Sequence, residues 1–252
     1  MFAFKLICIV STFFILVQSA SLKNKDEGKH RQKRDGGVSA ALIGAAISTG
    51  ASLVGTTVNG LKRSDFSVAT SGDVSNFASD ALILDFCKIE SGHMNQPLRD
   101  VSSGQREGFA GHKTSNSATG NWVQCRYRVG TEAMIYFMYS VPYSHDFNYN
   151  TLAASICHRS SRKCRDTSIN LMTTGTRGDL VRKTYYSTIE TLKVCNMGYC
   201  ITGVMGTSHK PQINLKVYPV KFSDLASAVQ GSAAANHWNE KDYDNFVKNE
   251  LA

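Results

Sequence analysis

Apolar and polar residues alternate through much of the chain beyond residue 62, and this period of two predicts β-strands. Positions 123–129 alternate strictly and then reach Gly130-Thr131, so we expect a half-buried strand that ends in a turn. The run 133–141 is apolar at both kinds of position, which predicts a central strand with both faces covered. A third clear alternation lies at 213–217.

The pattern elsewhere in this region is weaker. Residues 82–89 and 183–192 predict two further strands, and a helical period is limited to a turn or two around 166–172. Residues 62–221 therefore predict one mainly β domain, which at about 160 residues is large enough for its own core. The simplest architecture is a two-sheet antiparallel β-sandwich flanked by helices. The tail, 222–252, predicts one or two helices.

Residues 38–61 follow a different pattern, because they contain no charged residue and are rich in Gly, Ala, Ser and Thr. Wound at 100° per residue, they predict an uncharged amphipathic helix within 35–61. Its apolar face would carry Ile43, Ile47, Val54, Val58 and Leu61, and its polar face Ser48, Ser52 and Asn59. About 24 residues at a rise of about 1.5 Å reach about 36 Å, enough to cross a hydrocarbon core of about 30 Å. The alternative interpretations are a glycine-rich leader packed permanently on the domain and a poor membrane anchor.

The amino terminus predicts secretion. Lys5 precedes the apolar run 6–17, and the small residues Ser19 and Ala20 follow, which is the order of regions in a signal peptide covering residues 1–20.

Residues 21–34 form a basic segment that ends in Arg31-Gln32-Lys33-Arg34, the pattern that dibasic processing proteases cleave. We therefore expect the mature chain to begin at Asp35, although a solvated linker is the alternative. The net charge of the full chain is +8. Without residues 1–34 it falls to about +3, which argues little for a nucleic-acid partner.

Six cysteines remain once Cys8 leaves with the signal peptide: Cys87, Cys125, Cys157, Cys164, Cys195 and Cys200. An even number in an oxidising compartment predicts up to three disulfides, with fifteen possible pairings. The pairs Cys157/Cys164 and Cys195/Cys200 are close enough in sequence for local disulfides. A zinc site is the competing interpretation, but the chain has no C-x-x-C, so we expect no metal.

Catalytic motifs are absent from the sequence, with no G-x-S-x-G, H-E-x-x-H, phosphate loop or dinucleotide fingerprint, so we expect neither an enzyme nor a cofactor. The seven histidines are scattered singly. The triplet Arg177-Gly178-Asp179 raises integrin binding as a possibility, but such triplets often arise by chance.

Three short motifs carry a resemblance to a known family. Ala118-Thr119-Gly120, Ser140-Val141-Pro142-Tyr143 and Phe147-Asn148-Tyr149-Asn150 resemble the A-T-G, S-V-P-Y and W-Y-S-N motifs of the actinoporins, the pore-forming cytolysins of sea anemones, with relatives in predatory snails. Upstream, Gly50-Ala51-Ser52-Leu53 and Lys62-Arg63 resemble the family's pore helix and its basic end. The resemblance covers roughly 36–220. The six cysteines and the tail indicate a divergent branch, closer to the snail proteins.

The resemblance implies a β-sandwich that binds the phosphocholine headgroup of sphingomyelin, and an N-terminal helix that inserts into the membrane and oligomerises from a protein that is monomeric in water. The polar face of that helix would line the pore. Carried over residue by residue, the lipid-binding positions are Ser91, Trp122, Ser140, Pro142, Tyr143, Phe147, Tyr149, Tyr185 and Tyr186.

Several residues depart from the family pattern. Glu90 stands in place of an arginine, Trp122 in place of a valine, and Thr151-Leu152 in place of a tryptophan pair. Beyond Leu152 two registers compete. One aligns Tyr185-Tyr186 with the family's paired tyrosines, and the other aligns Arg177-Gly178-Asp179 with a family triplet.

We therefore expect a secreted pore-forming cytolysin of a venom, salivary or defensive secretion that acts on target cell membranes. A non-lytic lipid- or glycan-binding module of the same fold is the alternative, and a secreted lipase is disfavoured because no nucleophile motif is present.

Overall fold

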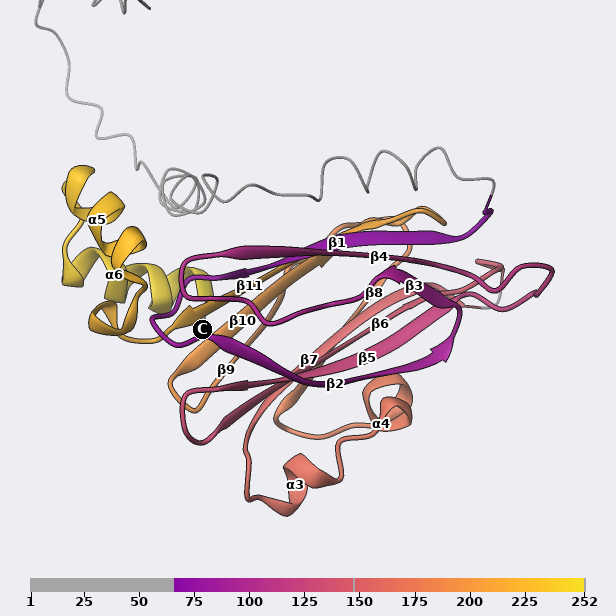
Figure 1. Cartoon of the computed structure of the whole chain (residues 1–252), viewed down its shortest axis with the longest axis horizontal. Coiled ribbons are helices and arrows are strands. Elements are labelled where there is room, and N and C mark those ends of the chain that lie inside the picture. Colours follow the sequence, from indigo (N-terminus) through magenta and orange to yellow (C-terminus); the bar gives the residue numbers. More distant parts are fainter. Residues whose placement is uncertain (1–65, 147, 252) are drawn as a thin grey trace, which may run out of the picture. The chain divides into compact units, whose positions relative to one another are not determined.

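The computed structural model describes residues 66–146 and 148–251, and in this part of the chain two β-sheets pack face to face (Figure 1). The strands are β1 Ala69–Asn76, β2 Leu82–Ser91, β3 His93–Gln96, β4 Arg106–His112, β5 Asn121–Val129, β6 Ala133–Val141, β7 Asn150–His158, β8 Leu180–Tyr185, β9 Leu192–Asn196, β10 Tyr199–Met205 and β11 Gln212–Pro219. The helices are α3 Arg162–Arg165, α4 Ile169–Thr174, the 3₁₀ turn η1 Phe222–Asp224, α5 Ser227–Ala235, α6 Glu240–Phe246 and the π-helical turn η2 Val247–Leu251.

One sheet has six strands in the order β3-β4-β1-β11-β10-β9, and the other has five in the order β2-β5-β6-β7-β8. The predicted β-sandwich is confirmed. It is not antiparallel throughout, however, because β1 and β11 pair in parallel. The expected helix over 35–61, the signal peptide and the basic segment lie outside the described residues. Within 66–146 and 148–251, no helix is both long and apolar enough to cross a bilayer.

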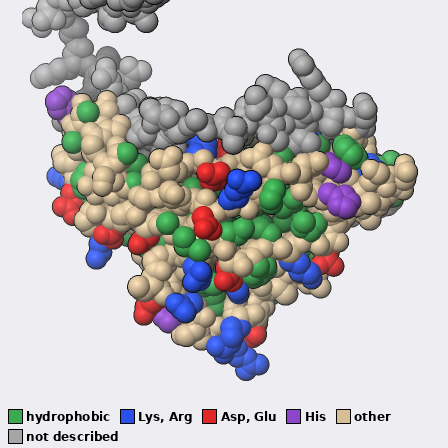
Figure 2. All heavy atoms as spheres, in the orientation of Figure 1, with side chains coloured by type: hydrophobic (Ala, Val, Ile, Leu, Met, Phe, Trp, Pro, Cys, Tyr) green, Lys and Arg blue, Asp and Glu red, His purple; other side chains and the backbone are tan. Residues whose placement is uncertain are grey.

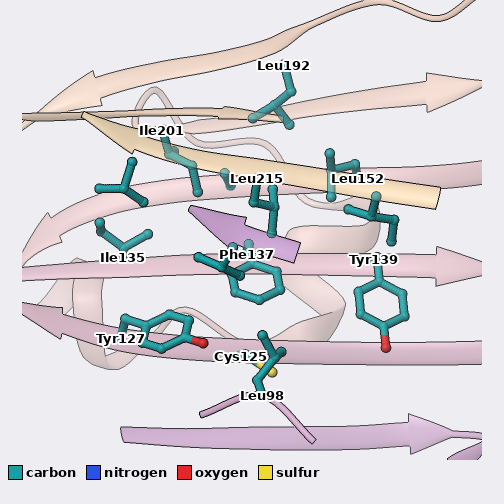
Figure 3. Close-up of a cluster of buried hydrophobic side chains, with 14 of the residues drawn as sticks. Leu98, Cys125, Tyr127, Ile135, Phe137, Tyr139, Leu152, Leu192, Ile201 and Leu215 are labelled. Atoms are coloured by element: carbon teal, nitrogen blue, oxygen red, sulfur yellow. The ribbon is translucent and has the colours of Figure 1, made fainter. Parts of the chain in front are cut away.

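The core lies between the sheets and follows the alternation of the sequence. Ile135, Phe137 and Tyr139 of the central strand β6 point into it, together with Leu152 and Leu215 from β7 and β11 (Figure 3). The other face of β6 is also buried. Its methionines and Tyr136 contact residues of α3 and α4. Both faces of this strand are therefore covered, which explains why its sequence is apolar without alternation.

Two strand predictions need correction. The alternation at 123–129 predicted a half-buried strand, but Gln124, at one of its polar positions, is buried, and its side-chain amide donates to the carbonyl of Thr167 next to α4. The weak strand expected at 183–192 does not exist as one element. The end of β8 lies in the five-stranded sheet and the start of β9 in the six-stranded sheet, so the chain crosses between sheets within this segment.

The helices of the tail cover a second cluster of buried side chains at one end of the sandwich. Phe77 and Tyr218 stack at 4.5 Å between ring centroids, and α5, α6 and η2 pack over them. Tyr243 is fully buried there, and its hydroxyl donates to the carbonyl of Pro219 at 2.6 Å. The tail therefore closes this end of the core.

Three disulfides are formed within the described residues. Cys157–Cys164 and Cys195–Cys200 confirm the two expected local pairs, and the remaining pair, Cys87–Cys125, joins β2 to β5.

Candidate functional site

A row of side chains crosses the outer face of the five-stranded sheet near the ends of its strands. The strand register places Ser91 beside Trp122, Trp122 beside Ser140, Ser140 beside Thr151 and Thr151 beside Thr184. Side chains at such directly paired positions lie about 5 Å apart on one face of a sheet. Four hydroxyls and one indole ring therefore share a narrow strip.

A pocket of about 350 Å³ opens at one end of this row. It is lined by Glu90, Ser91, Thr119, Gly120, Trp122, Ser140, Val141 and Pro142. Four of the predicted lipid-binding residues, namely Ser91, Trp122, Ser140 and Pro142, thus come together around one cavity. They come from β2, from β5 and from the end of β6, and β2 is separated from the other two strands in sequence by β3 and β4.

Two features hold this pocket in shape: a close approach of the backbone at Gly120 to the end of β6, and the buried side chain of Asn121. A Cβ atom at Gly120 would overlap the Val141 carbonyl oxygen and would lie 2.9 Å from Cα of Pro142, so only glycine fits there. The next residue, Asn121, is fully buried, and its amide donates to the carbonyl oxygens of His93 and His112. The Ala118-Thr119-Gly120 motif therefore precedes the residue through which β5 is hydrogen-bonded to β3 and β4 of the other sheet.

Some polar groups of the pocket already form hydrogen bonds within the protein, and others do not. The hydroxyl of Ser91 donates to the carbonyl of Gly120 at 3.0 Å, so it would have to rotate to donate to a ligand. The Ser140 hydroxyl has no hydrogen-bond partner among the described residues. The indole nitrogen of Trp122 is buried and has no acceptor in the described part of the chain, while its ring packs on the apolar cluster beneath α4. Ser140 is therefore the hydroxyl that is ready to bind.

Charge in the pocket comes from Glu90. Its carboxylate forms an ion pair of 2.8 Å with Lys88, and both side chains are exposed. A carboxylate beside an indole ring favours a cation such as a quaternary ammonium group, whereas the hydroxyls favour an anion.

Two exposed tyrosines lie where β7 and β8 meet the loops. Asn150 pairs with Tyr185, so Tyr149 and Tyr186 are the next residues beyond the paired ends, and their ring centroids are 4.4 Å apart. Tyr149 is 37% exposed and Tyr186 is 63% exposed. The two rings form an apolar tip next to Thr151 and Thr184 of the row.

The structure separates the remaining predicted positions from this tip. Tyr185 is only 1% exposed, its hydroxyl donates to the carbonyl of Glu190, and burial, aided by that residue's carboxylate, raises its pKa to about 12. It is a core residue, and its assignment to the lipid-binding surface is corrected. Tyr143 lies in a neighbouring hollow with the Lys113 ammonium 5.2 Å from its ring centroid, and Phe147 lies outside the described residues.

Sequence reasoning missed a pair of histidines in that neighbouring hollow. His145 and His209 stack with ring centroids 3.9 Å apart and nearly parallel planes. Burial, followed by the adjacent His145, lowers the pKa of His209, which the backbone of Tyr143 and the carboxylate of Asp146 partly oppose. The two residues are far apart in sequence, so no local sequence pattern predicts that their rings are in contact.

The Arg177-Gly178-Asp179 triplet has an internal role. The Arg177 and Asp179 side chains are 14% and 16% exposed and form an ion pair with each other. The same guanidinium donates to the carbonyl of Lys163 and to the hydroxyls of Ser155 and Thr167. The two charged side chains of the triplet are therefore engaged within the protein and are not available to an integrin. Within the described residues, no group of three or more His, Cys, Asp or Glu side chains could hold a metal ion.

Two curated proteins are similar to this chain. Echotoxin-2 of Monoplex parthenopeus is 28% identical over 200 residues, which cover 75% of this chain and 71% of that protein. Tereporin-Ca1 of Terebra anilis is 24% identical over 184 residues, which cover 69% of this chain and 97% of that protein. No protein-family model matches the chain.

Among solved structures, the lipid-binding protein Nakanori resembles this fold with a TM-score of 0.53 at 13% sequence identity. The alignment covers 65% of this chain and 78% of Nakanori. At this identity the likeness concerns the fold alone.

Proposed function

Because this chain is similar to the actinoporin-like toxins of snails, we propose that it is a secreted cytolysin whose sandwich binds phosphocholine headgroups, preferably those of sphingomyelin, and whose segment 35–61 forms oligomeric pores. At the level of the family, the relatives named as toxins support a pore-forming or lipid-binding toxin and suggest that the protein is not an enzyme. The headgroup and the pore are the finer parts of the proposal.

The convergence of Ser91, Trp122, Ser140 and Pro142 on one pocket carries the headgroup part. A phosphocholine zwitterion needs hydroxyl donors for its phosphate, and an aromatic face or a carboxylate for its quaternary ammonium. The pocket offers the Ser140 hydroxyl to the first group, and Trp122 with Glu90 to the second. The exposed Tyr149–Tyr186 tip adds amphipathic rings of the kind that favour the membrane interface.

Vesicle binding and dye release test the proposal with the mature chain, 35–252. We expect binding and leakage with vesicles that contain sphingomyelin and phosphatidylcholine, and much less of both with phosphatidylcholine alone. Equal leakage from the two kinds of vesicle would refute the preference for sphingomyelin. Binding without any leakage would favour the alternative, a non-lytic lipid-binding module.

A pair of variants ties the result to the pocket. Ser140→Leu places a branched side chain in the cavity and removes the available hydroxyl, so we expect vesicle binding to fall about tenfold or more, the effect of losing a hydrogen bond to a charged group. Ser232→Leu makes the same change on α5, among the helices that cover the other end of the sandwich, and should leave binding intact. Equal binding by the two variants would place the headgroup elsewhere.

A further inference from the structure

Residues 159–165, which run from the end of β7 through α3, carry a concentration of positive charge that the proposed lipid site does not use. Arg159, Arg162, Lys163 and Arg165 are all exposed, and we call these four side chains the α3 basic surface. Figure 2 shows lysine and arginine side chains gathering at the lower end of the view, where Figure 1 places α3.

Among the described residues, one ion pair neutralises part of this surface, and the carboxylate of the neighbouring Glu132 pairs with His158. Arg162 pairs with Asp166 at 3.3 Å, but the partners of Arg159 and Arg165 are neutral carbonyl groups of Thr131 and Ser160. Lys163 forms no ion pair within the described part of the chain. Like charges held this close repel one another, which costs stability unless a partner of opposite sign binds.

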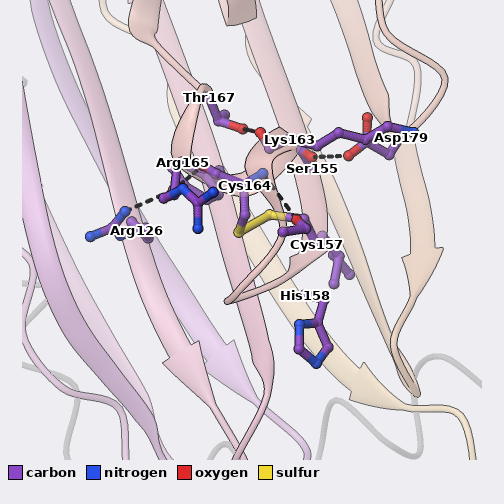
Figure 4. Close-up of a disulfide and its surroundings, with 12 residues drawn as sticks. Arg126, Ser155, Cys157, His158, Lys163, Cys164, Arg165, Thr167 and Asp179 are labelled. Atoms are coloured by element: carbon purple, nitrogen blue, oxygen red, sulfur yellow. Dashed lines mark hydrogen bonds between the residues drawn. A yellow bond between two sulfur atoms is a disulfide. The ribbon is translucent and has the colours of Figure 1, made fainter.

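The backbone under these charges is nevertheless firmly anchored. The Cys157–Cys164 disulfide ties α3 to the end of β7, as Figure 4 shows, and the Tyr136 hydroxyl donates to the carbonyl of Cys164 at 2.7 Å. The guanidinium of Arg177 holds the Lys163 carbonyl at 2.7 Å. A surface that is already ordered loses little conformational entropy when it binds a ligand.

The register of β6 and β7 separates this surface from the headgroup pocket. His158, the last residue of β7, pairs with Ala133 at one end of β6, whereas Thr151 pairs with Ser140 of the pocket near the other end. Seven positions along a strand correspond to about 23 Å. With the pocket at a bilayer, the α3 basic surface would be held away from the lipid headgroups, so a partner that extends outward from the membrane suits it best.

We propose that the α3 basic surface binds a sulfated polysaccharide of the target-cell surface. Four cations in seven residues match the closely spaced sulfates of a linear polyanion, and short Lys/Arg-rich segments recur in heparin-binding patches. Guanidinium groups bind oxyanions through paired hydrogen bonds, which suits the three arginines. This binding would concentrate the protein at the cell surface before it meets lipid, and it does not require pore formation.

Heparin is the probe, and the mature chain is the protein tested. The variant Arg162→Gln/Lys163→Gln/Arg165→Gln removes three charges, and Lys221→Gln/Lys241→Gln/Lys248→Gln removes three exposed charges around the C-terminal helices as a matched control. We expect the α3 variant to bind immobilised heparin at least about tenfold more weakly at low salt, with the slope of log affinity against log salt reduced by about two to three, because fewer counter-ions are released. The control should bind like the wild type. Thermal unfolding of each variant shows whether it is folded.

Three outcomes would overturn the proposal. An equal loss in the folded control variant would mean that net charge alone decides binding. Equal binding of chemically desulfated heparin would exclude recognition of sulfate. Binding that depends on the three residues with vesicles of phosphatidylserine, but not with heparin, would assign the surface to an anionic lipid instead.

Discussion

At Gly120 the backbone of β5 comes so close to the end of β6 that no side chain fits between them. We predict that Gly120→Ala destabilises the protein by about 1 to 3 kcal/mol, because the added methyl group must push the Val141 carbonyl away. The same displacement opens the proposed headgroup pocket, so vesicle binding should fall as well. Urea denaturation gives the first quantity and vesicle sedimentation the second.

Gly231 provides the matched substitution. It lies in α5, and a Cβ atom there would have no heavy atom within 4 Å. Gly231→Ala should therefore be neutral or stabilise the protein by up to about 1 kcal/mol through better helix propensity. A wild-type stability for Gly120→Ala would contradict the close approach.

The neighbours Tyr185 and Tyr186 should respond in opposite ways. Tyr185→Phe removes a partly buried hydrogen bond, so we expect a loss of about 1 kcal/mol in the free energy of unfolding and unchanged vesicle binding. Tyr186→Ala should leave stability within about 0.5 kcal/mol. It should weaken vesicle binding about threefold to tenfold, since it removes one ring of the exposed pair.

Urea denaturation and vesicle sedimentation of both variants decide this point. Loss of vesicle binding in folded Tyr185→Phe, with none in Tyr186→Ala, would show that the buried ring reaches the membrane.

At the scale of elements, the three disulfides close chain loops of very different length. Cys87–Cys125 spans 38 residues, whereas Cys157–Cys164 and Cys195–Cys200 span 7 and 5. Loop-closure entropy then predicts a stabilisation of about 4 kcal/mol for the first and about 2 to 2.5 kcal/mol for each of the others. Paired Cys→Ala variants should therefore rank in that order when the free energy of unfolding is measured in urea.

The α3 disulfide has a local consequence beyond this ranking. Cys157→Ala/Cys164→Ala should increase hydrogen exchange in 159–166, while Cys195→Ala/Cys200→Ala, in the β9–β10 hairpin, should leave that segment protected. Equal losses of stability for all three pairs would mean that contacts in the folded state outweigh loop length.

At the scale of the whole molecule, binding and permeation should be separable. The pocket and the tyrosine tip belong to the sandwich, whereas the uncharged amphipathic segment precedes it in sequence. We predict that deleting residues 35–61 from the mature chain abolishes dye release but preserves binding to sphingomyelin vesicles, because a helix is the element that can enter lipid with its backbone groups paired. Leakage by the truncated protein would show that another part of the chain forms the pore.

Much of the candidate site could be predicted because short motifs mark the ends of strands. The residues of Ala118-Thr119-Gly120 and Ser140-Val141-Pro142 meet in the structure since β5 and β6 are adjacent strands joined by a tight turn. Ser91 lies beside them because β2, which is more distant in sequence, pairs with β5. Only the resemblance to the actinoporins, and no pattern of alternation, indicated that Ser91 belongs to the site. No pattern in the sequence revealed the His145–His209 contact, which is made by two loops.

The alternation of side chains by itself determined the strands around β5, β6 and β11, and the even number of cysteines predicted up to three disulfides, because period and parity are local properties of a chain. Only the tertiary structure decided that Tyr185 points inward and Tyr186 outward, that the chain changes sheet between β8 and β9, and that Arg177 lies under α3. A period of two tells which residues share a face, but which face is buried depends on the elements that pack against it.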